Sequence, residues 1–167
     1  KQIYGGFEGA PDPLAWAFWG PLVGSAARVV AGPLSDKLGG ARVTHWAGLG
    51  MLASTVWVTT LTSPTGLDSF PMFVAGMLTM FFFAGVGNAS TFKQMPMLFE
   101  PRQAGGVIGF TAAIAAYGPF LFGMLFAASF GAFKSATPVF YGLAAFFAFN
   151  VVLNWWMYAR RGAANPC

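Results

Sequence analysis

Charge is what this sequence has least of. Of its 167 residues, nine are Lys or Arg and five are Asp or Glu, so charged residues make up 8% of the chain. A soluble domain of this size normally has about a quarter of its residues charged, whereas 56% of these residues are hydrophobic. Most of the surface must therefore face lipid, and we expect a polytopic protein of the bilayer.

Cysteine, metal-ligand clusters and basic runs are scarce as well. Cys167, the last residue, is the only cysteine, which excludes an internal disulfide. The sequence has no pattern typical of a metal site, a phosphate-binding loop or a nucleophile–base pair, so we expect no metal, no cofactor and no enzymatic activity. The basic residues form no run that would track phosphates, and we expect no nucleic-acid partner.

Long apolar runs dominate what is present. Crossing the hydrocarbon core takes about 20 apolar helical residues. We predict an all-α membrane bundle whose five helices lie at about residues 14–34, 43–61, 70–99, 105–130 and 139–158. Asp12-Pro13 before the first segment is typical of a helix N-cap with a first-turn proline. The connections are too short for a soluble domain.

Basic residues gather on one side of this predicted bundle. When five helices alternate, the first and third connections share a side with the C-terminal tail, and they carry Lys37, Arg42, Arg102, Arg160 and Arg161. The opposite side has only Lys1 and Lys134. By the positive-inside rule we predict a cytoplasmic C-terminus and an outer N-terminus, in the cell (inner) membrane.

Five is an odd number of helices for a transporter. Many transporter folds consist of paired repeats, with six-helix halves in the commonest case. The chain also opens with Lys-Gln-Ile rather than with methionine. We infer that it begins just after a helix that is absent here, and that an N-terminal half of the same protein is its partner.

Arg28 is the most informative residue. A charge inside an apolar helix costs about 2.5 to 3.5 kcal/mol, so it is a functional candidate by default. Gly20, Gly24, Arg28 and Gly32 recur every four residues, and glycines at that spacing admit another helix. We therefore expect Arg28 to face the protein interior. Its guanidinium fork matches planar oxyanions such as carboxylate or nitrate. The alternative is an arginine that snorkels or locks two helices through backbone carbonyls.

The third segment has small and polar residues at mid-membrane. Gly85, Gly87 and Asn88 suggest a backbone free to meet a ligand and an amide able to donate two hydrogen bonds to an oxyanion. Helix–helix adhesion is an equally good reading of the same residues. Lys93 is more typical of an interface anchor than of a ligand.

The fourth segment repeats the small-residue pattern. Gly105, Gly109 and Ala113 lie in one row with Tyr117, and Pro119 should bend the helix. A packing seam with a kink is the alternative to a ligand-binding role.

The first connection resembles the inter-helix loop motif of the major facilitator superfamily. The motif covers residues 32–42, and the residues that match it are Gly32, Asp36, Lys37, Gly39, Gly40 and Arg42. The two adjacent glycines permit a tight reversal, Asp36 can meet the positive end of a neighbouring helix, and the two cations hold the loop in the cytoplasm.

Three longer stretches together are similar to the nitrate/nitrite porter family of that superfamily. They run over residues 19–28, 87–92 and 109–118. The resemblance implies that the five helices are the last five of a twelve-helix fold that alternates access by rocking its halves. It implies that Arg28 clamps the anion with a second arginine from the missing half, and that residues 109–118 are a glycine-rich nitrate signature.

Two residues depart from the family pattern, because Ala115 and Pro119 stand where glycine is frequent. We expect a transporter of nitrate and nitrite, with Arg28, Gly87, Asn88, Gly109, Ala113 and Tyr117 at the substrate site. The absence of an intramembrane carboxylate favours exchange over proton symport. The alternatives are a porter of another small organic or inorganic anion, and a non-transporting membrane sensor or scaffold.

Overall fold

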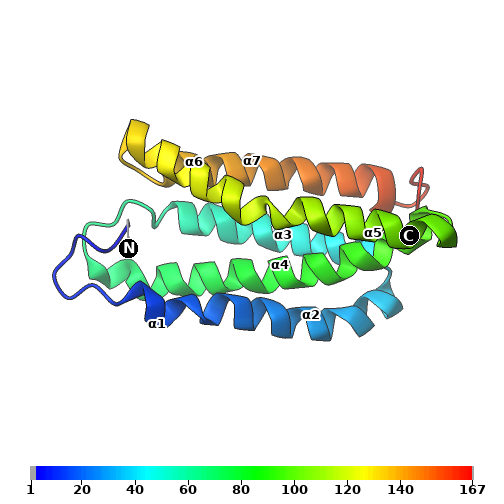
Figure 1. The fold of residues 1–167 in the computed structure, drawn as a ribbon, viewed down its shortest axis with the longest axis horizontal. Coiled ribbons are helices and arrows are strands. Elements are labelled where there is room, and N and C mark those ends of the chain that lie inside the picture. The colour runs from blue at the N-terminus through cyan, green and yellow to red at the C-terminus, as the bar shows by residue number, and fades with distance from the viewer. Residues whose placement is uncertain (1–2, 167) are drawn as a thin grey trace.

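A computed structural model describes residues 3–166 as an all-helical bundle (Figure 1). Lys1 and Cys167, both named above, lie outside the described residues. The elements are α1 (Pro13–Ala17), α2 (Trp19–Leu38), α3 (Gly40–Thr59), the 3-10 turn η1 (Leu67–Ser69), α4 (Phe70–Leu98), α5 (Pro101–Ala116), α6 (Gly118–Phe133), α7 (Thr137–Asn154) and the π-helical turn η2 (Trp155–Ala159). The all-α fold class is confirmed.

Four stretches of helix are long and apolar enough to cross a membrane, namely Pro13–Leu38, Leu67–Leu98, Pro101–Phe133 and Thr137–Ala159. The remaining predicted span, residues 43–61, corresponds to α3, which is not among these four. Arg42, His45 and several hydroxyl side chains lower its hydropathy. This helix instead has the largest number of buried residues, eight, because it packs against α2, α4 and α7. A helix that is shielded from lipid on several sides tolerates polar groups that a lipid-facing helix does not.

The packed part of the bundle consists of α2, α3, α4 and α7. Glycine makes its closest approach possible: a Cβ on Gly85 would lie 2.9 Å from the carbonyl carbon of Gly24 and 3.0 Å from its Cα. On the other side of α4, a Cβ on Gly76 would meet the Val58 side chain at 2.7 Å. Glycines in the first and third segments therefore do admit a neighbouring helix, as their spacing predicted.

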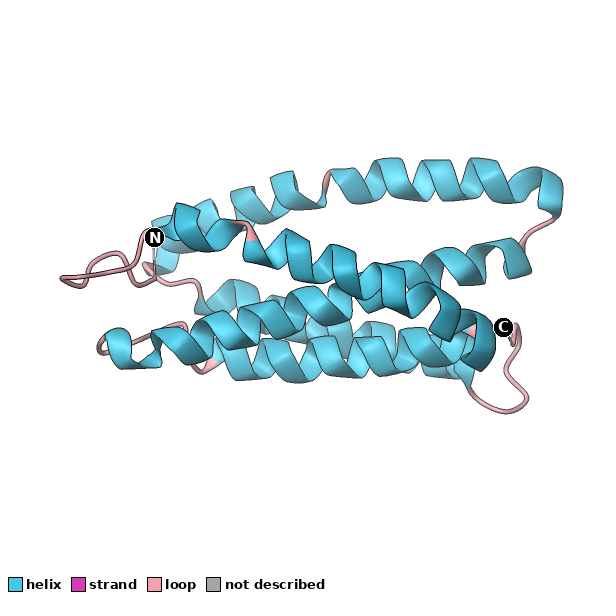
Figure 2. Cartoon of the chain, turned by 90° about the horizontal axis from the view of Figure 1, so that it is seen from below, coloured by secondary structure: helices cyan, strands magenta, loops and turns pink. Residues whose placement is uncertain are grey.

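The α5–α6 rod stands apart from this packed part (Figure 2). Within the described chain α5 contacts only α4 and α6, and α6 contacts only α5 and α7. A Cβ added to Gly105 or Gly109 would meet no atom within 4 Å. The small-residue row predicted as a packing seam thus has no partner helix among residues 3–166.

A break at Tyr117 divides the rod. The Tyr117 N–H bonds to the carbonyl of Ile114, a tightened last turn, and α6 then restarts at Gly118. Pro119 has no N–H to give to Ala115, four residues earlier, and its ring crowds that carbonyl. The helix is thus interrupted two residues before Pro119, where the sequence predicted a bend. At the start of the chain, Asp12 accepts a hydrogen bond from the Leu14 N–H and caps α1, as predicted.

The first connection is shorter than the sequence suggested. We expected a loop over residues 35–42, but α2 continues to Leu38 and α3 begins at Gly40, which leaves Gly39 alone between them. Gly39 has φ 91° and ψ 135°, a conformation that a side chain would strain, so this one glycine makes the whole reversal. The tight reversal is confirmed and the loop length is wrong.

The segment before α1 is anchored at the opposite end of the bundle. Tyr4 is buried, and its hydroxyl donates to the carbonyl of Leu61 at 3.0 Å and lies 3.1 Å from the Ser69 hydroxyl. Its ring packs edge-on against Phe70. These contacts tie the N-terminal segment to the turn between α3 and α4.

Candidate functional site

Arg28 is exposed in the described chain, whereas the glycine row predicted that it faces the protein interior. Gly20 and Gly24 pack on α4, but Arg28 is exposed and Gly32 has no atom within 4 Å of its hypothetical Cβ. Four residues advance an α-helix by about 400°, so a row at that spacing drifts by about 40° at every step. Arg28 therefore lies about 80° round the helix from Gly20. The buried stripe of α2 continues through Ala27 and Ala31 instead.

The Arg28 side chain makes no hydrogen bond or ion pair with any residue between 3 and 166. The alternative in which neighbouring carbonyls bind the guanidinium therefore does not hold in this chain. Arg28 lies within the candidate span Pro13–Leu38. It is thus an unpaired cation inside a candidate membrane span, on the flank of the contact between α2 and α4.

Asn88 lies at the same depth as Arg28. Gly24 lies against both Phe81 and Gly85, and Gly20 lies against the Phe81 ring, so α2 and α4 run parallel and Arg28 is about level with residues 85 to 89. Asn88 is partly buried, and its Oδ1 is buried with no hydrogen-bond partner among the described residues. Gly87, beside it, meets only Ala47 Cβ at 3.6 Å.

A cavity of about 620 Å³, which we call the polar pocket, opens between α3, α4, α5 and α7. Asn88 and Gly87 line it, and so do Thr111 and Ala115 of the predicted signature stretch. Its other polar lining residues are Thr44, Thr91, Gln94, Asn150, Asn154 and Tyr158. The lining contains no charged side chain.

Gly109, Ala113 and Tyr117 are not brought into this pocket. They alternate with Thr111 and Ala115 along α5. Side chains two positions apart in a helix differ by about 200° in direction, so the two sets point to opposite sides of α5. Tyr117 is 66% exposed and Ala113 is exposed as well. The structure thus assembles Gly87 with Asn88 and separates them from the predicted α5 residues.

Sequence reasoning missed a polar network in the core of the bundle. The Thr44 hydroxyl lies 2.8 Å from the Ser90 hydroxyl and 3.0 Å from Gln94 Oε1. Gln94 donates to Asn154 Oδ1, and the Asn154 amide donates to the carbonyl of Ala41 at 2.9 Å. The network joins α3, α4 and α7. The only signal in the sequence was the presence of amides in apolar segments.

The loop-motif residues serve the reversal and the helix contact. Asp36 forms an ion pair with Lys93 of α4, and both side chains are about half exposed. The sequence suggested an interface anchor for Lys93 and a helix terminus as the partner of Asp36, and it did not predict that the two pair with each other. Gly40 is buried, and a Cβ there would lie 3.0 Å from the Ser90 carbonyl oxygen. Lys37 and Arg42 are exposed at the same end of the bundle.

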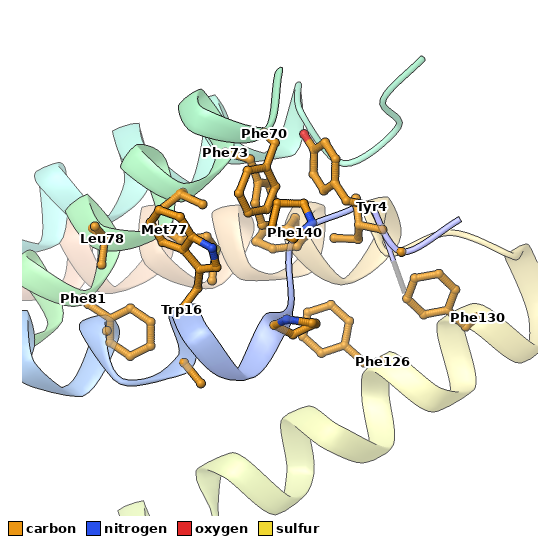
Figure 3. A pocket seen from close by; sticks show the side chains of 17 residues that line it. Tyr4, Trp16, Phe70, Phe73, Met77, Leu78, Phe81, Phe126, Phe130 and Phe140 are labelled. Atoms are coloured by element: carbon orange, nitrogen blue, oxygen red, sulfur yellow. The ribbon is translucent and has the colours of Figure 1, made fainter. Parts of the chain in front are cut away.

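A second cavity of about 550 Å³ lies at the opposite end, and Figure 3 shows its aromatic lining. Trp16, Phe70, Phe81 and Phe126 come from α1, α4 and α6 and line this cavity. None of the substrate-site residues predicted from the sequence lines it. Among residues 3–166, no group of three or more His, Cys, Asp or Glu could hold a metal ion.

Comparison with known proteins gives close relatives. No family model matches the chain. It is 64% identical over 167 residues to a probable nitrate/nitrite antiporter, NarK2, from Thermus thermophilus. That alignment covers 100% of this chain and 38% of NarK2. It is 31% identical to the nitrate/nitrite transporter NarU of Escherichia coli (strain K12), over 89% of this chain and 37% of the relative.

A third relative is the nitrite extrusion protein of Bacillus subtilis (strain 168), 31% identical over 81% of this chain and 33% of its own length. The chain therefore spans little more than a third of these relatives. Apolar helices and transporter relatives together make it part of a multi-pass membrane protein. On this similarity over its whole length, the chain belongs to the nitrate/nitrite porter family.

Proposed function

We propose that the longer protein to which this chain corresponds transports nitrate and nitrite across the cell (inner) membrane. Its relatives are named as nitrate/nitrite transporters or antiporters, and the similarity to one of them extends over every residue of this chain at 64% identity. No nucleophile, metal cluster or cofactor is needed for such a function, because the chemistry is binding and release.

The assignment of the substrate depends on Arg28. It is exposed, has no partner within the described chain and lies inside a candidate membrane span. Left facing lipid, such a charge costs about 2.5 to 3.5 kcal/mol. A planar oxyanion that accepts two parallel N–H donors from the guanidinium offsets that cost and also fixes the orientation of the anion.

The rest of the transporter supplies the opposite wall of the site in this proposal. The five helical passes, α1–α2, α3, α4, α5–α6 and α7–η2, are helices eight to twelve of a twelve-helix major facilitator fold. The N-terminal half then covers the exposed flank of α2 where Arg28 lies, and the two halves rock to alternate access. Gly109, Ala113 and Tyr117, exposed in this chain, face that half.

The distribution of charge supports an orientation of the bundle in the membrane. The end at which α2 and α4 terminate carries Lys37, Arg42, Lys93, Arg102, Arg160 and Arg161 but only Asp36 and Glu100 as acids. We call it the basic end. By the positive-inside rule it lies in the cytoplasm together with the C-terminus. No carboxylate lies in the interior of the four candidate spans, which favours anion exchange over proton symport.

Replacing Arg28 by Lys in the full-length protein tests the proposal. Lysine keeps the charge but loses the fork, and losing one charge-assisted hydrogen bond of about 1.5 to 3 kcal/mol lowers nitrate uptake by about 10- to 150-fold. Arg161→Lys, at an exposed position beyond η2, is the matched control. Uptake is measured in proteoliposomes loaded with nitrite.

Normal uptake by the Arg28→Lys variant would show that the arginine is structural and would sink the substrate assignment. Full nitrate binding with no flux in the wild-type protein would identify a sensor or scaffold instead of a transporter. If the wild-type protein also takes up a small carboxylate, and the Arg28→Lys variant loses that uptake to the same extent as nitrate uptake, the protein is a porter of another anion.

A further inference from the structure

We propose that the polar pocket is a second, charge-free station for the transported anion, with Asn88, Thr111 and Tyr158 as its hydrogen-bond donors. The proposal rests on the transport function above and adds a place on the path of the anion. Arg28 lies on α2, which contributes no residue to this pocket, so the two sites are distinct.

The pocket reaches from mid-bundle toward the basic end. Asn88 lies eleven residues before Phe99 and Thr111 eleven residues after Glu100, so the antiparallel turn between α4 and α5 sets the two at the same depth. Tyr158, in η2, lies farther toward the basic end. The three side chains therefore mark a route from the level of Arg28 toward that end of the bundle.

Several polar side chains of the pocket already donate a hydrogen bond. Thr44 donates within the core network, Thr91 donates to the carbonyl of Gly87 at 2.7 Å, and the Asn150 amide donates to the carbonyl of Phe146. Among the described residues, no hydrogen bond engages the side chains of Thr111, Tyr158 or Asn88. Two hydroxyls and one amide NH₂ thus have no acceptor among the described residues.

Asn88 gives the independent sign that something binds here. A buried polar atom without a partner costs free energy, and such atoms are rare enough in folded proteins to need an explanation. No protein group holds the Asn88 amide in one orientation. Its NH₂, which no described protein group accepts from, can donate to an oxyanion in the pocket.

The field around the pocket selects an anion over a cation. Six basic and two acidic residues surround the basic end, and Arg28 adds an unpaired charge at the depth of Asn88. No carboxylate lines the pocket. A positive field that leads into a low-dielectric cleft raises the local concentration of anions and repels cations.

Neutral donors also suit a station for transfer. A neutral donor lacks the Coulomb attraction that a guanidinium adds to its hydrogen bonds with an anion. An anion that moves from Arg28 to Asn88 and Thr111 is therefore held more weakly and leaves readily. An arginine in this pocket, in addition to Arg28 outside it, would hold the anion too tightly for release.

Nitrate binding by the full-length protein, measured by isothermal titration, tests the station. We expect two nitrates per wild-type protein, one tight and one weak, and only the weak one in the Arg28→Lys variant. The double variant Thr111→Val, Tyr158→Phe removes two neutral donors without changing shape. It should weaken the weak site by about tenfold or more and leave the tight site within about twofold.

Thr79→Val is the matched control, because the Thr79 hydroxyl donates to the carbonyl of Ala75 and the residue lies outside the pocket. It should leave both sites unchanged. A single nitrate per wild-type protein, or a weak site that survives the double variant, would overturn the station while the Arg28 result stands. Uptake that is indifferent to Arg28→Lys overturns the transport proposal instead, so the two failures are distinguishable.

Discussion

Replacing Gly85 by Ala should destabilise the contact between α2 and α4. The added Cβ would lie 2.9 Å from the Gly24 carbonyl carbon and 3.0 Å from its Cα, and it would come closer still to the carbonyl oxygen. All three are backbone atoms, which no rotamer change can move. Reaching the ordinary contact distance of 3.4 Å requires the helices to separate by at least about 0.5 Å.

That separation loosens the best-packed helix pair in the molecule. Overpacking of this kind costs about 1 to 3 kcal/mol. The gain in helix propensity from Gly to Ala, about 1 kcal/mol, offsets only part of it. We expect Gly85→Ala to lower the thermal unfolding midpoint of the full-length protein in detergent, followed by tryptophan fluorescence.

Gly87→Ala is the control on the same helix, two residues away. Its Cβ would meet only Ala47 Cβ at 3.6 Å, an ordinary contact, so the midpoint should stay the same or rise. The two alanines should therefore act with opposite sign. Equal midpoints for the two variants would mean that α2 and α4 do not approach at Gly85, and the packing described here would be refuted.

Two further variants test contacts that hold the bundle together. Tyr4→Phe loses the hydroxyl bonds to Leu61 and Ser69 and should cost about 1 kcal/mol of stability in a denaturant titration, whereas Tyr141→Phe, 65% exposed, should cost nothing measurable. Asn154→Leu removes the link between Gln94 and the Ala41 carbonyl and should cost about 1 to 3 kcal/mol by the same assay, and an unchanged midpoint would show that this network does not hold the helices.

Local features of the fold were predictable from the sequence because single residues determine them. The Asp12 cap depends on one short side chain ahead of a proline, and the reversal at Gly39 depends on one residue that accepts a positive φ. The break at Tyr117 follows from a missing N–H at Pro119. Each is decided within one helical turn, so a reader of the sequence has all the information needed.

Contacts between distant residues were not predictable in the same way. Asp36 and Lys93 pair across 57 positions of sequence, and nothing near either residue names the other. The face of α2 was also misjudged, because a four-residue row was treated as straight although it drifts by about 40° per step. Gly87 and Asn88 are neighbours in the sequence, so their proximity was predictable. That Thr111 joins them in one pocket depends on the path of α5, which the sequence does not reveal locally.

Exposure has to be interpreted by side-chain chemistry in a membrane protein. The α6 residues Phe120, Leu121 and Met124 are more than half exposed, and lipid covers such groups at no cost. Arg28 is exposed at membrane depth too, but lipid cannot cover a guanidinium without a penalty of about 2.5 to 3.5 kcal/mol. The apolar surface of α6 therefore requires no partner, whereas the flank of α2 that carries Arg28 requires water, an anion or another part of the protein. That asymmetry is why the arginine, and not the larger apolar surface, directs the functional proposal.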